Sequence, residues 1–131
     1  MNKELITHDR IHLVQPLDVI DFHNIAAKSY FIMSDSGGVQ EEAPSLGIPV
    51  LVLRDTTERP EGVAAGTLKL IGTETDDVLK AMMELLDVPE VHQKMAEATN
   101  PYGDGTASKR ILDSIAYEFN QSKEKPIDFI S

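Results

Sequence analysis

Short apolar runs alternate with longer amphipathic segments through the first half of the chain, and this alternation sets the expected architecture. Four runs predict strands, at residues 11–15, 30–33, 49–53 and 68–71. The run at 49–53 is continuously apolar, as expected of a strand covered on both faces. Strands that alternate with helices favour an α/β fold, here a parallel Rossmann-like sheet with flanking helices and right-handed crossovers.

Helices are predicted between these strands, at residues 18–28, 38–46 and 60–65. Gly47 follows the second of them and suits a helix C-cap, and Pro60 suits the first turn of the third. After Gly72 the pattern is helical only. We expect a helix at 76–87 capped by Thr75, a second one from Pro89, and a last one at 106–120. The inner face expected for the helix at 76–87 consists of Val78, Leu79, Met82, Leu85 and Leu86.

The length of 131 residues fits one domain, which we place at 1–120 and follow with a polar tail at 121–131. No apolar run approaches the length that crosses a bilayer, and residues 1–10 lack the apolar core of a secretory signal. We therefore expect a cytoplasmic protein without a membrane partner. The absence of cysteine excludes disulfides and thiolate metal sites.

The formal net charge of −10 disfavours a nucleic-acid partner, because lysine and arginine are scattered and form no basic patch. The same charge disfavours any ligand that carries a diphosphate. An anion site in this chain must therefore be built from local hydrogen-bond donors.

The segment at 34–44 could supply such donors. It lies where a buried strand ends and a helix begins, and open α/β sheets bind ligands at the carboxyl ends of their strands. Gly37 and Gly38 would let the backbone approach a ligand, and Ser36 adds a hydroxyl beside the amides of the helix start. Glu42, about one turn further, could reach a pair of ribose hydroxyls. A simple tight turn followed by solvated glutamates fits the same residues equally well.

A second polar stretch at 54–61 follows the next buried strand, so it should emerge at the same edge of the sheet. Arg59 precedes a proline at a helix start, which holds its backbone extended, and its guanidinium could fork onto a phosphate. A hydrated loop with internal arginine–glutamate pairs is the alternative. Two such loops at adjacent strand ends favour a ligand site.

Other candidate residues suggest no chemistry. The four histidines lack metal-ligand spacing, so no metal site is expected. His23, beside Phe22, is interpreted as a packed or surface residue, and Tyr102 as the anchor of a turn. No Walker loop, dinucleotide fingerprint or Ser-His-Asp arrangement is present.

The ordered motifs at 34–44, 47–51, 54–61 and 65–67, with those at 16–18 and 100–105, resemble the non-hydrolysing UDP-N-acetylglucosamine 2-epimerases. The resemblance covers roughly residues 10–120. It implies that Ser36, Gly37 and Gly38 bind the diphosphate of UDP. Glu42 matches the acidic residue that holds the uridine ribose, and Arg59 matches a conserved arginine of the ligand cleft.

Two further positions are compared on the same basis. Phe22 matches the position whose backbone contacts the uracil, while Leu17 stands where some relatives have a glutamine near the base. The family interconverts UDP-GlcNAc and UDP-ManNAc without a cofactor, by eliminating UDP and adding it back to a glycal intermediate. Such enzymes serve cell-envelope polysaccharide biosynthesis, form homo-oligomers, and place the UDP-sugar between two domains of a GT-B-like fold.

The chain departs from this family by lacking the N-terminal domain and the start of the C-terminal one. The acids and the histidine that carry catalysis lie there, so no catalytic residue is expected in this chain and it should be inactive alone. In a sheet of order 3-2-1-4-5-6 the run at 11–15 would be strand 3 and would have lost its neighbours. It should then pair elsewhere, pair with another chain, or stay loose. Alternatives to an epimerase part are a stand-alone, non-catalytic UDP-binding module and the nucleotide-binding half of a GT-B glycosyltransferase.

Overall fold

A computed structural model describes residues 8–129. Its centre is a parallel sheet of three strands in the order β1-β2-β3, with Val50 of β2 opposite Ile32 of β1 and Leu68 of β3. The strands are β1 (Ile32–Ser34), β2 (Val50–Val52) and β3 (Leu68–Leu70). Three of the four predicted strands and the parallel α/β architecture are thus confirmed.

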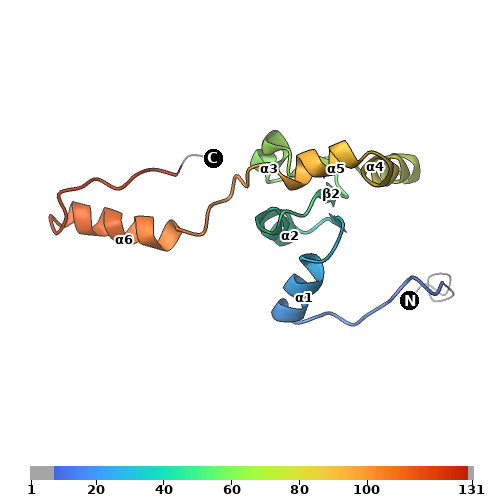
Figure 1. Cartoon of the computed structure of the whole chain (residues 1–131), viewed down its shortest axis with the longest axis horizontal. Helices are drawn as coiled ribbons and strands as arrows, with labels where there is room; N and C mark the ends of the chain where they lie inside the picture. The colour runs from blue at the N-terminus through green and yellow to red at the C-terminus, as the bar shows by residue number, and fades with distance from the viewer. Residues whose placement is uncertain (1–7, 130–131) are drawn as a thin grey trace.

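The strand predicted at 11–15 is wrong. This segment is exposed and forms no strand, and Figure 1 shows it in the extended chain that leads into the first helix. Apolar composition alone does not make a strand, because the backbone groups must also find a partner strand. Within residues 8–129 this run pairs with no other strand of the chain, so new pairing inside the chain is not observed, and pairing with another chain stays a prediction.

Helices follow each strand and continue beyond the sheet (Figure 1). They are α1 (Val19–Ala26), α2 (Gly37–Glu42) with its 3₁₀ continuation η2 (Ala43–Leu46), α3 (Pro60–Ala65), α4 (Thr75–Asp87), α5 (Pro89–Ala96) and α6 (Ala107–Glu118). Gly47 ends η2 in the left-handed conformation with φ 69°, as the C-cap prediction requires. The cap predicted at Thr75 is wrong, because Glu74 takes the N-cap position and Thr75 is the first helical residue.

The core lies on both faces of the sheet, and β2 is buried on both sides as expected. On one face Leu51 packs with Ile71 beneath α4 and α5. On the other face Val50 and Val52 pack with Leu68 beneath the α2–η2 segment. This double cover fixes the carboxyl ends of β1 and β2, where the polar loops begin.

The face that α4 turns to the core is narrower than predicted. Ala81 and Leu85 are buried, whereas Leu79 and Leu86 are 55% and 51% exposed. Residues 78, 81, 82 and 85 share one narrow stripe at helical spacing, and positions 79 and 86 fall about a quarter turn from its centre. Among the described elements, only the sheet and α5 cover α4, so the flank of α4 that carries Leu79 and Leu86 remains in solvent.

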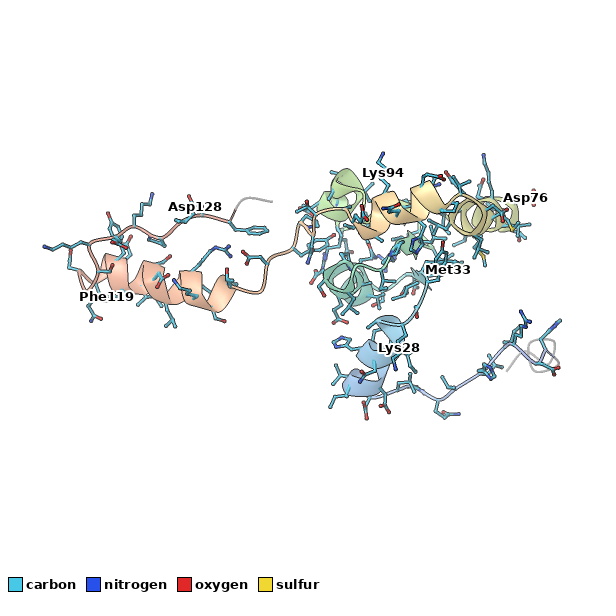
Figure 2. All side chains as sticks on the ribbon, viewed as in Figure 1. Lys28, Met33, Asp76, Lys94, Phe119 and Asp128 are labelled. Atoms are coloured by element: carbon cyan, nitrogen blue, oxygen red, sulfur yellow. The ribbon has the colours of Figure 1, made fainter. Side chains whose placement is uncertain are left out.

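The last helix lies apart from the sheet and the other helices (Figure 1). Its apolar positions, which include Ile111 and Leu112, are exposed, and Figure 2 shows Phe119, 73% exposed, near the far end. The amphipathic helix expected at 106–120 is confirmed, but nothing within residues 8–129 covers its apolar stripe. In the same residues no helix is long and apolar enough to cross a membrane.

Candidate functional site

The corner between β1 and α2 is open to solvent. Ser36 is the N-cap of α2, with extended backbone, and its side chain makes no capping hydrogen bond to the helix. Its amide donates to Ser34 Oγ at 3.0 Å, which fixes the turn out of β1. Ser36 and Gly38 are exposed and Gly37 is half-buried. The three residues predicted to meet a ligand therefore lie on the surface at the carboxyl end of a strand.

Packing among residues 8–129 requires neither glycine of this corner. A Cβ at Gly37 would come no nearer than 3.8 Å to another atom, Arg59 Nη2, and one at Gly38 no nearer than 3.9 Å. Neither residue has a positive φ. Glycine in a helix costs roughly 0.5–1 kcal/mol relative to alanine. Neither close packing nor a left-handed backbone among the described residues therefore accounts for either glycine.

The second loop brings an arginine to this corner. Arg59 is the residue before Pro60 at the start of α3, and its Nε donates to a carboxylate oxygen of Glu41. Its Nη1 donates to the Glu58 carbonyl at 3.1 Å. The position of Nη2 next to Gly37 places a guanidinium beside the bare backbone. The structure thus brings together the two loops that the sequence places at one edge of the sheet.

A carboxylate and a histidine flank the other side of the corner. His23 Nε2 lies 3.1 Å from Glu42 Oε2, and both side chains are about half exposed. This contact brings α1 against α2, so Phe22, half-buried and next in sequence to His23, belongs to the same region. The pairing of His23 was missed in the sequence, where the residue was assigned only to packing or the surface. The His23–Glu42 contact joins two helices that are distant in the sequence, so no local sequence pattern indicates it.

A buried amide connects the two loops, and it too was missed. Gln40 Nε2 donates to the Ser36 carbonyl at 3.2 Å, and Gln40 Oε1 accepts from Thr57 Oγ1 at 2.6 Å. The Thr57 oxygen in turn accepts from the Arg59 amide at 3.0 Å. The one signal in the sequence was a polar residue, Gln40, between the apolar Val39 and Ala43 of the same helical run, and the structure buries it.

Tyr102 anchors the loop behind α3, as predicted. Its amide donates to Asn100 Oδ1 at 3.0 Å, and its buried hydroxyl lies against Gly62, where an added Cβ would come within 2.4 Å. Among residues 8–129 this hydroxyl has no hydrogen-bond partner. Burial raises the pKa of the Tyr102 phenol. Gly62, unlike the glycines of the corner, is therefore required by packing.

The site is an open surface and not a closed cavity. A hollow of about 400 Å³ lies elsewhere, between β3 and α4, where Lys69 and Glu84 form an ion pair. That pair lowers the pKa of Glu84, chiefly through the hydrogen bond from Lys69. Over the part of the chain that the structure describes, no three histidine or carboxylate side chains gather as a metal ion would require.

Comparison with known proteins gives a consistent result. The model of the family UDP-N-acetylglucosamine 2-epimerase matches residues 1–116. The Bacillus subtilis UDP-N-acetylglucosamine 2-epimerase is 61% identical over 121 residues, which are 92% of this chain and 32% of that protein. The chain therefore spans about a third of the length of this relative.

Two solved structures are similar over most of the chain. The S. aureus MnaA–UDP co-structure is 61% identical, with a TM-score of 0.86, over 95% of this chain and 34% of that one. The UDP-GlcNAc 2-epimerase of Neisseria meningitidis bound to UDP-GlcNAc is 56% identical, with a TM-score of 0.76, over 79% of this chain and 28% of that one. Both relatives were therefore captured with a ligand that contains UDP.

Proposed function

Because the chain belongs to the UDP-N-acetylglucosamine 2-epimerase family, we propose that it provides the UDP-binding part of such an enzyme. The diphosphate is held at the corner formed by Ser36, Gly37 and Gly38, with Arg59 beside it. The observation that carries this proposal is a pair of glycines that the fold does not need, next to a guanidinium.

The chemistry of the corner suits a diphosphate in an acidic protein. Backbone amides and the Ser36 hydroxyl donate to phosphate oxygens without adding a formal charge, and α2 is too short to rely on a large helix dipole. Arg59 adds a cation beside Gly37, and a phosphate would compete with Glu41 for it. Local donors thus overcome the average field of a chain with net charge −10.

Glu42 and Phe22 would bind the nucleoside. The Glu42 carboxylate can accept hydrogen bonds from the two ribose hydroxyls, and His23 holds its other side at 3.1 Å. The Phe22 amide already donates to the Asp18 carbonyl at 2.9 Å inside α1. A uracil would therefore be met by the Phe22 carbonyl, which keeps a second lone pair.

In the complete enzyme this site would hold UDP while the C2 proton is lost and the C1–O bond breaks to give the glycal, and while UDP adds back at C1 and a proton returns to the opposite face of C2 to give UDP-ManNAc. Moving the C2 proton requires an acid and a base at the sugar, and the resemblance assigns neither to this chain. Binding donors alone do not lower that barrier. We therefore propose that the chain by itself binds UDP and does not epimerise the sugar.

Calorimetric titration tests the binding. The chain should bind UDP more tightly than UMP, because UMP lacks the second phosphate that the corner holds. Arg59→Ala should lower UDP affinity about tenfold, and Lys94→Ala on α5, outside the site, should change nothing. Equal binding of UDP and uridine would contradict a diphosphate site. NMR observation of UDP-GlcNAc with the chain should show no UDP-ManNAc, and its appearance would contradict the assignment of catalysis to other residues.

The wider setting is proposed on the same basis. A complete enzyme of this kind would work in the cytoplasm, in cell-envelope polysaccharide biosynthesis, as a homo-oligomer with a GT-B-like arrangement of two domains. The exposed apolar stripe of α6 supports the presence of further covering surface in the assembled protein.

A further inference from the structure

Gln40 is a buried polar side chain at the centre of the candidate site. It is 1% exposed, and an amide removed from water costs several kcal/mol unless both of its ends are hydrogen-bonded. Both ends are used, the nitrogen toward the Ser36 carbonyl and the oxygen toward the Thr57 hydroxyl. The amide therefore spans from the glycine corner to the arginine loop.

Thr57 passes the connection on to Arg59. A backbone amide can only donate, so the Arg59 N–H must use a lone pair of the Thr57 oxygen. At the other end the Ser36 carbonyl can only accept, so Gln40 must turn its NH₂ to Ser36 and its oxygen to Thr57, and the Thr57 proton is donated to that oxygen. The three side-chain hydrogen bonds of this relay, from Arg59 to Thr57, from Thr57 to Gln40 and from Gln40 to Ser36, therefore all run in one direction.

The relay ends at the two groups that would hold a phosphate. At one end is the Ser36 carbonyl, directly before Gly37 and Gly38. At the other end is the backbone of Arg59, whose guanidinium lies beside Gly37. Gln40 is buried and out of reach of a ligand, and Thr57, which is half-buried, already donates its one hydroxyl proton to Gln40.

We propose that Gln40 and Thr57 are positioning residues for diphosphate binding, because their hydrogen bonds set the distance between the amide corner and the Arg59 guanidinium. This inference rests on the proposed function of the site. Its alternative is that the relay merely satisfies buried polar groups and stabilises the fold.

A matched pair of substitutions separates these roles. Thr57→Val keeps the shape and removes the hydroxyl, and Thr57→Ser keeps the hydroxyl. In the full chain, Thr57→Val should weaken UDP binding about fivefold to tenfold, the worth of one neutral hydrogen bond, and Thr57→Ser should restore it. In the Arg59→Ala background Thr57→Val should have no further effect, since the residue acts through Arg59.

The double variant Gln40→Met/Thr57→Val controls for folding. It removes both partners of the Gln40–Thr57 hydrogen bond together, so neither of these two is left unsatisfied, and only the Arg59 amide still loses its acceptor. Its unfolding temperature should lie closer to that of the unmodified chain than the unfolding temperature of Thr57→Val does, while its UDP affinity stays low. Recovery of UDP affinity together with stability would show that the relay serves the fold alone and would overturn the inference.

The remaining outcomes are also decisive. If the unmodified chain does not bind UDP, the proposed function and this inference both fail. If the unmodified chain binds UDP and Thr57→Val binds it equally well, the inference alone fails. If Thr57→Val lowers UDP affinity by the same factor in the Arg59→Ala background as in the unmodified chain, the inference also fails, because the effect would not pass through the guanidinium.

Discussion

Replacing Gly38 by alanine should separate the stability of this chain from its ligand binding. The new Cβ would meet only Glu42 Oε1 and Ser36 Oγ, both at 3.9 Å, which is ordinary van der Waals contact. No positive φ has to be kept at this residue. The folded chain can therefore accept alanine, and the gain in helix propensity should stabilise it by about 0.5 kcal/mol, or about 1–4 °C in Tm.

The same methyl group would stand where a phosphate approaches the amides of α2. Losing one charge-assisted hydrogen bond costs about 1.5–3 kcal/mol, so the Kd for UDP should rise roughly tenfold to a hundredfold. Calorimetry gives the Kd and thermal unfolding gives the Tm of the same sample. Ser108→Ala is the matched control, since Ser108 is the second residue of α6 as Gly38 is of α2, and it should leave UDP affinity unchanged. A Gly38→Ala chain that binds UDP within twofold of the original would refute the reasoning.

Three other substitutions or titrations probe the neighbouring groups. Glu41→Gln should tighten UDP binding about twofold to fivefold at low salt, because it frees Arg59 from an exposed ion pair and removes a negative charge; no change in calorimetric Kd would contradict this. Gly62→Ala should destabilise the fold by about 1–3 kcal/mol in thermal unfolding, because the Cβ would lie 2.4 Å from the Tyr102 hydroxyl and 2.5 Å from Leu68; an unchanged Tm would disprove the overlap. The phenol of Tyr102 should titrate above 10.0 when followed by ultraviolet absorbance. Because the unfolded chain loses this proton at lower pH than the folded chain, the free energy of unfolding should fall as pH rises past 10.0. Tyr102→Phe should remove this pH dependence, and its persistence in that variant would contradict the assignment.

The sequence predicts those parts of the fold that depend on local pattern. The strand at β2 follows from a continuous apolar run, the end of η2 from Gly47, and the start of α3 from Pro60. The meeting of the two polar loops follows from parallel strands whose carboxyl ends share one edge. In each case one short segment, or one rule of topology, is enough.

The remaining features depend on neighbours that a pattern does not identify. Residues 11–15 have the composition of a strand, but no described strand lies beside them to accept their hydrogen bonds. Leu79 and Leu86 are apolar, yet no described element covers that flank of α4. The contact of His23 with Glu42 and that of Gln40 with Thr57 join residues 19 and 17 positions apart, so only the packed fold brings them together.

The most direct test is an NMR titration of the ¹⁵N-labelled chain with UDP, followed through its backbone amides. We predict that the largest shift changes fall on the amides of Ser36, Gly37 and Gly38, with smaller ones at Arg59. Absence of any change at these residues, or larger changes at the hollow between β3 and α4, would contradict a diphosphate site at the β1–α2 corner.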